Sequence, residues 1–464
     1  MAAKFGTSGL RGLSDDLSDD IVRLYVSVFT NIFSHSGSLV VGQDLRASSP
    51  RILDAVVASG IDAGLHVLDC GVVPTPALAL ECAARGAPGV MVTGSHIPAD
   101  RNGLKFYTQG GEFTKADEGV LVRGVAGEGV DGAGAKGSVA TCNALKRYAA
   151  RYLDFFPRGA LQGRRIGVWQ HSSAAREVLP EILSALGAEV VLLAPSDDFI
   201  AVDTEAVSGA VRDRLAEWAT THGLDAIVST DGDADRPLLA DETGTVVPGD
   251  VLGPMTARAM GARNLVTTVS ANTMVEAMDH FESVSRCRIG SPYVIEIMEE
   301  KIASGVENVL GYEPNGGVLL GFQVQDGGRS LAPLMTRDAV LPIVAVLVAA
   351  SGDKVSALVS ALPQRRTATD RLEHVPIEIS AAIVADVLGG QSDLFPTYLG
   401  AIRVIDTTEG ARLTMESGLI VTIRPSGNAP ELRCYVEAET AEVAAEVLSD
   451  IMARLAARVA NCRK

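Results

Sequence analysis

The stretch Leu224–Arg236, LDAIVSTDGDADR, joins a short apolar run to three alternating aspartates and an arginine. Its first part is apolar and β-prone, which predicts a buried strand that ends just before the acidic residues. Asp231, Asp233 and Asp235 repel one another strongly in a low dielectric, and a bound cation is the simplest relief. A ligand set made only of oxygen atoms favours Mg²⁺ over Zn²⁺. From this segment alone, a solvated acidic turn is the alternative.

On both sides of this stretch, short apolar runs alternate with amphipathic segments. The runs predicted to be buried strands are Leu39–Gly42, Leu65–Asp69, Gly89–Thr93, Arg165–Trp169, Glu189–Leu193, Ala226–Ser229, Leu265–Val269, Val284–Arg288 and Val309–Tyr312. Helices are predicted at Asp19–Ser34 and Pro50–Ala63. Three successive sets of strand, helix and strand predict three α/β domains with mainly parallel mixed sheets.

The end of the chain has a different pattern. Strands are predicted at Val375–Ser380, Ala401–Asp406, Ala411–Glu416, Leu419–Arg424 and Leu432–Ala438, followed by a helix at Ala441–Val459. Hairpin turns are expected at Glu409-Gly410 and Ser417-Gly418. This order predicts a C-terminal α+β domain with an antiparallel sheet. We place the four domains at residues 1–145, 146–250, 251–365 and 366–464.

The composition excludes several classes of protein. The 464 residues include 40 Lys and Arg against 57 Asp and Glu, and the net charge of -17 argues against nucleic acid or an anionic membrane as partner. Six scattered cysteines form no CxxC pair, which predicts reduced thiols in the cytoplasm. The opening residues contain no apolar signal core, and the apolar stretch Ala339–Ala350 is too short to span a bilayer. We therefore expect a cytoplasmic protein in which that stretch is a buried helix.

A second segment suited to chemistry is Val92–Pro98, VTGSHIP, which follows the predicted strand Gly89–Thr93. Ser95 is therefore expected on a tight loop at the carboxyl end of a parallel sheet, where such sheets bind ligands. A serine hydroxyl needs a base or a metal beside it to act as a nucleophile, and His96 could orient a phosphate or share its charge. An ordinary turn is the alternative. Lys105 is either a surface residue on an edge strand or, if burial lowers its pKa, a general acid or base.

Three further loops suit anions or sugars. Phe5–Gly12, FGTSGLRG, combines glycines with one arginine, so that backbone N–H groups and a guanidinium can approach a phosphate. Arg424–Arg433, RPSGNAPELR, offers two arginines, a hydroxyl, an amide and backbone donors for a dianion, and a hairpin loop with incidental arginines is the alternative. In Gly311–Gly317, GYEPNGG, Glu313 and Asn315 could hydrogen-bond vicinal sugar hydroxyls, and a simple turn fits equally well.

Taken together and in this order, these segments resemble the α-D-phosphohexomutase family, which includes phosphomannomutases, phosphoglucomutases and phosphoglucosamine mutases. The family's active-serine loop reads TASHNP and this chain has TGSHIP; its metal loop reads DGDGDR and this chain has DGDADR. Its phosphate loop reads RPSGTEP and this chain has RPSGNAP, while FGTSGLRG is similar to the family's first motif. The likeness covers nearly the whole chain and implies four domains around a central cleft.

The resemblance implies reversible phosphoryl transfer between the 1- and 6-positions of a hexose phosphate, through a phosphoserine and a bisphosphorylated sugar. Ser95 would carry the phosphoryl group, and a hexose 1,6-bisphosphate would serve as activator. The ligands of Mg²⁺ would be Asp231, Asp233, Asp235 and phospho-Ser95. The other catalytic residues would be His96, Lys105, Arg11 and Arg236. Contacts to the sugar and its non-reacting phosphate would come from Glu313, Asn315, Arg424, Ser426, Gly427, Asn428 and Arg433.

Two loops depart from the family pattern. The family's sugar loop usually reads GE-x-SG and is often followed by histidine, but here Asn315 stands at the serine position and Gly317 at the histidine position. Ile97 stands where the family usually has asparagine. Because the sugar loop does not match the form expected of a phosphoglucosamine mutase, we expect mannose as the preferred sugar. A phosphoglucomutase, a phosphoglucosamine mutase and an inactive sugar-phosphate-binding homologue are the alternatives, and a monomer or homodimer is expected.

Overall fold

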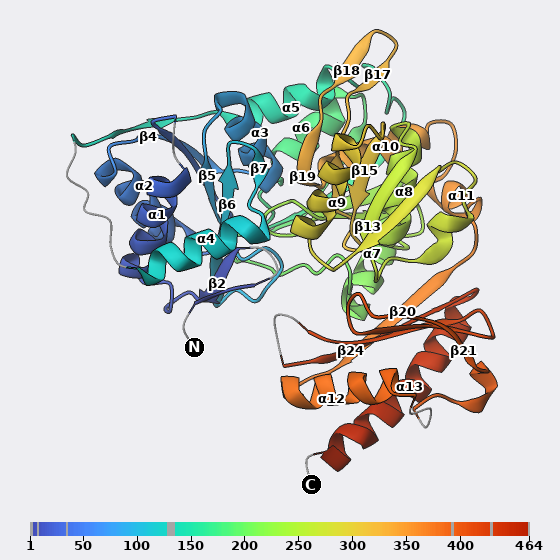
Figure 1. The fold of residues 1–464 in the computed structure, drawn as a ribbon. Coiled ribbons are helices and arrows are strands. Elements are labelled where there is room, and N and C mark those ends of the chain that lie inside the picture. The colour runs from blue at the N-terminus through green and yellow to red at the C-terminus, as the bar shows by residue number, and fades with distance from the viewer. Residues whose placement is uncertain are drawn as a thin grey trace.

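The computed structural model describes residues 3–6, 9–33, 36–127, 135–390, 394–426 and 430–462. Four main sheets with their helices follow one another along the chain, and we call these parts domains I to IV (Figure 1). Domains I to III lie side by side, and domain IV lies below them in the view of Figure 1, where strand β20 connects it to the rest. The predicted fold class is confirmed.

Domain I contains a mixed sheet in the order β1-β2-β6-β5-β3-β4-β8, with β7 paired to β6. Its strands are β1 (Lys4–Phe5), β2 (Leu10–Leu13), β3 (Ser38–Gln43), β4 (His66–Val72), β5 (Gly89–Val92), β6 (Arg101–Thr108), β7 (Gly111–Glu112) and β8 (Ser138–Thr141). Its helices are α1 (Asp19–Phe33), α2 (Ser49–Asp62), α3 (Thr75–Arg85), α4 (Lys115–Ala126) and α5 (Ala144–Leu153). Strands β5, β3, β4 and β8 run parallel, and β6 pairs antiparallel with β5 and β2.

Domain II has a smaller sheet in the order β10-β9-β11-β12, in which β12 alone is antiparallel to its neighbour. Its elements are β9 (Arg165–His171), α6 (Val178–Ala185), β10 (Glu189–Pro195), α7 (Gly209–His222), β11 (Ala226–Thr230) and β12 (Pro237–Ala240). The strand predicted before the three aspartates is thus confirmed as β11.

Domain III has a sheet in the order β14-β13-β15-β16-β19, parallel over its first three strands and antiparallel after them. Its strands are β13 (Asn264–Thr268), β14 (Ser283–Cys287), β15 (Val309–Tyr312), β16 (Val318–Leu320), the hairpin β17 (Val324–Asp326) and β18 (Arg329–Leu331), and β19 (Leu334–Asp338). Its helices are α8 (Gly249–Ala259), η1 (Thr273–Ala277), α9 (Ser291–Ala303), α10 (Val340–Ala349) and α11 (Val355–Ser360).

The apolar stretch Ala339–Ala350 forms the buried helix α10, as predicted. Among the described residues, no helix is both long enough and apolar enough to cross a membrane.

Domain IV is an antiparallel sheet in the order β20-β24-β23-β22-β21, and helices α12 and α13 cover one of its faces (Figure 1). Its elements are β20 (Arg366–Leu372), α12 (Ile377–Leu388), η2 (Thr397–Leu399), β21 (Ile402–Asp406), β22 (Ala411–Met415), β23 (Ile420–Pro425), β24 (Leu432–Ala438) and α13 (Ala441–Cys462).

One predicted strand of domain IV, Val375–Ser380, is wrong. The edge strand is β20, which ends at Leu372, and α12 begins within the predicted strand. Pro376 directly precedes the helix with a φ of -53°, a value that suits a helix start. Ile383 and Val387 are buried at helical spacing, so the apolar alternation at the start of the segment is the beginning of a longer helical pattern.

The hydrophobic core distinguishes domain IV from the other three. One continuous cluster of buried side chains extends through domains I, II and III and includes Leu78 and Val344. Domain IV has a separate cluster beneath its sheet, which includes Val421 and Leu455. Apolar packing therefore joins the first three domains, while domain IV meets domain III through hydrogen bonds such as that from Asn272 Nδ2 to Thr367 Oγ1 (2.9 Å).

Asp338 ties helix α5 to domain III. Its carboxylate accepts hydrogen bonds from Tyr148 Oη at 2.6 Å, from Tyr152 Oη, and from the backbone N–H of Val340 at 3.0 Å. All of these groups are buried. The carboxylate therefore satisfies two phenolic hydroxyls that cannot reach water and also accepts the N–H of Val340, the first residue of α10.

We expect Asp338→Ala to lower the free energy of unfolding by about 3 kcal/mol, because it leaves two buried hydroxyls and the Val340 N–H without this acceptor. Denaturant unfolding followed by circular dichroism measures this loss. Asp279→Ala, at an exposed position of domain III, is the control and should change stability by less than about 0.5 kcal/mol. Equal stability of the two variants would contradict this role of Asp338.

Candidate active site

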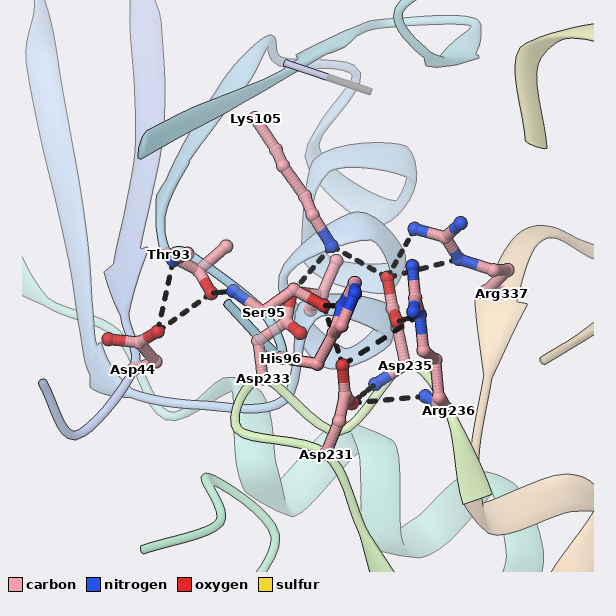
Figure 2. A network of polar contacts seen from close by, with 12 residues as sticks. Asp44, Thr93, Ser95, His96, Lys105, Asp231, Asp233, Asp235, Arg236 and Arg337 are labelled. Carbon is pink, nitrogen blue, oxygen red and sulfur yellow. Dashed lines mark hydrogen bonds and ion pairs between the residues drawn. The ribbon is translucent and has the colours of Figure 1, made fainter. Parts of the chain in front are cut away.

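The three aspartates lie on the loop between β11 and β12, which we call the acidic loop (residues 231–236; Figure 2). Each of Asp231, Asp233 and Asp235 is at most 1% exposed. One oxygen atom from each lies within 4.8 Å of the others, the spacing of a set that can hold a metal ion. A solvated acidic turn is therefore excluded.

Ser95 lies directly against this loop, and its Oγ donates a hydrogen bond to Asp231 Oδ2 at 2.6 Å (Figure 2). The residue follows β5, as predicted, and is fully buried with a φ of 53°, a left-handed conformation that is strained for serine. Its backbone N–H donates to Thr93 Oγ1 at 2.8 Å, and that hydroxyl donates to Asp44 Oδ2 at 2.7 Å. The strained loop is thus held by side chains of two neighbouring parallel strands.

Arg46 also holds the serine loop, although the sequence did not single it out. Its Nη2 donates to the carbonyl oxygens of Ser95 at 2.8 Å and Ile97 at 2.6 Å. Its Nη1 donates to the carbonyl oxygens of Pro98 at 2.6 Å and Arg101 at 2.9 Å. One buried guanidinium therefore fixes both ends of the loop that carries Ser95.

The surroundings of Arg46 connect the serine loop to domain II. Its Nε pairs with Asp44 Oδ2 at 3.2 Å, and its guanidinium lies 3.9 Å from the ring centroid of Phe199. A Cβ atom at Gly94 would come within 2.7 Å of the guanidinium, so a larger residue there would require Arg46 to shift. The signal in the sequence was Asp44-Leu-Arg46 directly after a predicted strand, at the same edge of the sheet as Ser95.

His96 lies beside Ser95, with 3.4 Å between its Nδ1 and the serine Oγ. Burial, followed by the positive charges of Arg236 and Arg11, lowers the pKa of His96 well below the ordinary histidine value. The imidazole is therefore neutral near neutral pH and offers a hydrogen bond rather than a positive charge.

Lys105 lies in β6 between two paired strands, so the alternative of a surface lysine on an edge strand is wrong. Its Nζ donates to Asp233 Oδ2 and to Asp235 Oδ2, each at 2.6 Å. Burial by itself lowers the pKa of Lys105, but the two carboxylates outweigh burial and the pKa is raised. The condition set for an acid or base role, a pKa lowered by burial, is therefore not met, and Lys105 is a cation at neutral pH.

The acidic loop leaves oxygen atoms free for a metal ion. Lys105 binds one oxygen of Asp233 and one of Asp235, while Oδ1 of each is buried without a hydrogen-bond partner among the described residues. Asp231 adds a third carboxylate on the side of Ser95. Unpartnered buried carboxylate oxygens suit a hard divalent cation, so these residues fit Mg²⁺.

The charge of the acidic loop is unevenly divided. Burial and the neighbouring Asp233 and Asp235 raise the pKa of Asp231 well above the ordinary aspartate value. Burial acts on Asp235 as well, but nearby cations led by Arg337 outweigh it and lower the pKa of that carboxyl. Since a bound cation favours the ionised form, it would bring Asp231 back to a carboxylate.

Two arginines add positive charge beside the three aspartates: Arg236, the last residue of the acidic loop, and Arg11 of domain I. Arg236 Nε lies 3.9 Å from Asp231 Oδ2 and 3.7 Å from Asp235 Oδ1, and no described residue accepts a hydrogen bond from it. Burial, followed by Arg236 and Arg337, lowers the pKa of Arg11 to about 10, so Arg11 remains a cation at neutral pH. Positive charge beside Ser95, with Arg236 Nε not hydrogen-bonded by any described residue, is suited to an anionic ligand.

The predicted sugar loop of domain III is linked to the acidic loop through Arg337. Arg337 Nη1 donates to Glu313 Oε2 at 2.9 Å, and its Nη2 and Nε donate to Asp235 Oδ2 at 2.7 and 3.1 Å. Asn315 Oδ1 accepts the Gly317 N–H at 3.0 Å. The structure thus brings Glu313 to the site, held by an arginine to which the sequence assigned no role.

The predicted phosphate loop lies in domain IV. Arg424 and Arg433 face each other on β23 and β24, where like charges directly opposite are unfavourable unless compensated. Arg424 Nη1 lies 3.4 Å from Glu409 Oε1, and Arg433 Nη2 lies 3.0 Å from Glu431 Oε2. Ser426 is buried and follows β23. Two further predicted contacts, Gly427 and Asn428, lie outside the described residues.

Glu205 of domain II is influenced by Arg236 of the acidic loop and by the arginine pair Arg424 and Arg433 of domain IV. Burial and then Asp203 raise the pKa of Glu205, while Arg236, Arg424 and Arg433 act in the opposite direction. Glu205 therefore lies within electrostatic range of Arg236 in domain II and of the arginine pair of domain IV.

Comparison with known proteins decides the family. Phosphoglucomutase/phosphomannomutase models match the whole length in order: domain I at residues 2–128, domain II at 147–244, domain III at 248–366 and the C-terminal domain at 371–454. The chain belongs to the phosphoglucomutase/phosphomannomutase family. The resemblance noted in the sequence is thereby confirmed.

Individual members of the family are similar over nearly the full chain. A phosphomannomutase from Sinorhizobium fredii (strain NBRC 101917 / NGR234) is 43% identical, covering 98% of this chain and 99% of the relative. A phosphomannomutase from Salmonella muenchen is 39% identical, covering 98% and 96%. The crystal structure of a phosphoglucomutase/phosphomannomutase family protein from Burkholderia thailandensis has a TM-score of 0.73 at 19% identity, covering 99% and 98%, so the two share the fold.

We expect Mg²⁺ to raise the thermal midpoint of the protein by about 2–5 °C at saturation, since an ion that binds only the folded state stabilises it. Asp233→Asn removes one ligand and should abolish the shift. Asp198→Asn makes the same charge change on an exposed loop of domain II and should retain the shift. Scanning fluorimetry with increasing Mg²⁺ measures all three proteins, and equal shifts in both variants would exclude a metal site at the acidic loop.

Proposed function

We propose that this chain is a phosphomannomutase, which moves a phosphoryl group between the 1- and 6-positions of a hexose phosphate and prefers mannose. The observation that carries this proposal is the 2.6 Å contact between Ser95 Oγ and Asp231 Oδ2, because it places a buried hydroxyl against carboxylates that fit a divalent cation. The family and the phosphomannomutases among its similar members support the same assignment.

The reaction begins with a phosphoryl group on Ser95. A sugar hydroxyl attacks the phosphorus, the bond from phosphorus to Oγ breaks, and the proton released by the hydroxyl balances the proton that Oγ regains. The resulting bisphosphorylated sugar turns around and returns its other phosphoryl group to Ser95 by the reverse step. Such transfers depend on in-line positioning and on neutralisation of charge, and the cations around Ser95 support the second of these.

We assign Asp231, Asp233 and Asp235 as the protein ligands of Mg²⁺, together with an oxygen of phospho-Ser95. When bound, the ion supplies positive charge to the phosphoryl oxygens. Arg46 keeps the Ser95 loop fixed during transfer, since its four carbonyl contacts restrain the backbone on both sides of the nucleophile.

Four side chains around Ser95 receive the other roles. Arg11 and Arg236 bind the oxygens of the transferring phosphoryl group, because both are cations near Ser95 and no described residue accepts a hydrogen bond from Arg236 Nε. Lys105 is placed for proton transfer by its position between Asp233 and Asp235 beside Ser95, and a phosphoryl group or metal ion that competes for these carboxylates would make its proton easier to release. His96 orients the phosphoryl group through a hydrogen bond.

The non-reacting phosphate requires a second site, which we place at Arg424, Ser426 and Arg433, with Gly427 and Asn428 from the same loop. The separate core of domain IV supports a domain that can move to release and recapture the intermediate. Glu313 and Asn315 remain predicted sugar contacts. Initial phosphorylation of Ser95 is assigned to a hexose 1,6-bisphosphate, and the cytoplasmic location and the monomer or homodimer remain predictions.

Ser95→Ala should reduce conversion of mannose 1-phosphate to mannose 6-phosphate by at least about 1,000-fold in kcat/KM, since it removes the group that carries the phosphoryl. Binding of mannose 1-phosphate, measured by calorimetry, should persist. Ser417→Ala, on an exposed hairpin turn of domain IV, is the control with normal activity. Turnover by Ser95→Ala at the wild-type rate would refute the proposal.

The preference for mannose is tested by kcat/KM on mannose 1-phosphate, glucose 1-phosphate and glucosamine 1-phosphate, each with a trace of the matching 1,6-bisphosphate. We expect mannose 1-phosphate to lead by about tenfold, a difference typical of discrimination by a few sugar contacts. A clearly higher kcat/KM on glucose 1-phosphate or glucosamine 1-phosphate would show that the chain prefers that sugar instead. Absence of turnover on all three would favour the alternative of an inactive sugar-phosphate-binding protein.

A further inference from the structure

A third arginine lies in line with the arginine pair of domain IV. In the register of the sheet, Arg371 on β20 is directly opposite Arg433 on β24, which is directly opposite Arg424 on β23. Residues opposite each other on antiparallel strands project from the same face, with their Cβ atoms roughly 5 Å apart. Three guanidinium groups on three adjacent strands therefore form one row, which we call the arginine row.

The arginine row projects from the face of the sheet that is turned away from its helices. Leu432 and Cys434, the neighbours of Arg433 along β24, belong to the core beneath α12 and α13. The row therefore points in the opposite direction, toward the side on which domain III lies (Figure 1). Glu409 confirms this placement, because it pairs with Arg424 and also accepts the Ile289 N–H of domain III at 2.7 Å.

Carboxylates only partly compensate the arginine row. Arg371 Nε lies 3.2 Å from Glu373 Oε1 and 3.8 Å from Glu431 Oε1, so that it shares Glu431 with Arg433. Nη1 and Nη2 of Arg371 donate no hydrogen bond to another described residue. The side chains of Arg424, Arg433 and Arg371 are 8%, 30% and 46% exposed, so the row extends from a buried end to an open rim.

We propose that Arg371 is the third arginine of the site for the non-reacting phosphate and forms its outer rim. The inference rests on the proposed function and adds a residue from outside the phosphate loop. A phosphate dianion accepts several charge-assisted hydrogen bonds at once, and Nη1 and Nη2 of Arg371, which bond to no other residue in the described part of the chain, are available donors. Arg371 is remote from the Ser95 loop in the chain and contacts none of its residues, so it acts on capture of the sugar phosphate rather than on phosphoryl transfer.

Arg371→Ala should raise KM for mannose 1-phosphate and weaken its binding about five- to tenfold, the effect of one half-exposed charged hydrogen bond, with kcat changed less than about twofold. Arg371→Lys should recover part of the loss, because it keeps the charge but not the fork of donors. Arg403→Ala, an exposed arginine on the opposite edge strand β21, is the matched control and should leave KM unchanged. Thermal midpoints verify that all variants are folded.

A second variant distinguishes direct contact from an effect through Glu431. If Arg371 acts only by drawing Glu431 away from Arg433, its loss will have no effect in a Glu431→Gln background. Direct contact predicts that the double variant Arg371→Ala/Glu431→Gln still binds inorganic phosphate and mannose 1-phosphate about fivefold more weakly than Glu431→Gln alone.

The inference is overturned if Arg371→Ala behaves like Arg403→Ala, or if its effect disappears in the Glu431→Gln background. In either case wild-type turnover leaves the proposed function intact. A wild-type chain that does not bind mannose 1-phosphate overturns both the proposed function and this inference.

Discussion

The mutual repulsion of three buried carboxylates is the constraint on which the rest of the site depends. Asp231, Asp233 and Asp235 lie together with almost no access to water, an arrangement that is strongly unfavourable without compensating charge. Lys105 compensates two of them from domain I, and Arg337 compensates one from domain III. The compensation is incomplete, since carboxylate oxygens remain without hydrogen bonds. A divalent cation bound there would complete it and would place positive charge beside the Ser95 hydroxyl.

This constraint also explains how three domains share one core. The serine loop, the acidic loop and Arg337 come from three different sheets, and their partners are separated by at least 102 residues in the chain. Contacts as short as these require domains that are fixed relative to one another, and the continuous hydrophobic cluster provides that fixed arrangement. Domain IV carries the arginine row on a separate core, which suits a site that must accept and release the other end of the substrate.

An acidic protein can bind an anionic substrate only if its cations are gathered locally. The net charge of -17 is spread over the whole molecule, whereas Arg11, Arg236 and Lys105 lie around the acidic loop and further arginines line one face of domain IV. Local fields at such sites depend on near neighbours far more than on the total charge. The overall charge therefore argues against polyanionic partners but is compatible with a small sugar phosphate.

Much of the fold could be predicted from the sequence because its α/β strands are continuous apolar runs. Strand β11 and the buried helix α10 follow directly from such runs. The edge strand β20 could not be predicted, because its residues are largely polar and exposed, and the adjacent apolar residues belong to helix α12. Local pattern cannot distinguish the start of an amphipathic helix from a short strand when only a few residues are considered.

The loops that carry Ser95 and the three aspartates could also be predicted from the sequence, but the residues that contact these loops could not. Ser95 and the three aspartates lie in distinctive motifs, whereas Arg46 and Arg337 act through contacts with segments distant in the chain. The pKa of Lys105 could not be predicted from the sequence for the same reason. Burial could be anticipated from its strand, but the two carboxylates that raise its pKa belong to another domain. Long-range geometry, rather than local composition, determines these properties.

The central claim is that Ser95 accepts and donates a phosphoryl group, and intact-mass spectrometry tests it most directly. Incubation with mannose 1,6-bisphosphate should add about 80 Da to the protein, peptide mapping should place this mass on Ser95, and mannose 1-phosphate should then remove it. The Ser95→Ala protein should gain no mass. Phosphate on a different residue, or turnover of mannose 1-phosphate by a protein that never gains this mass, would contradict the account.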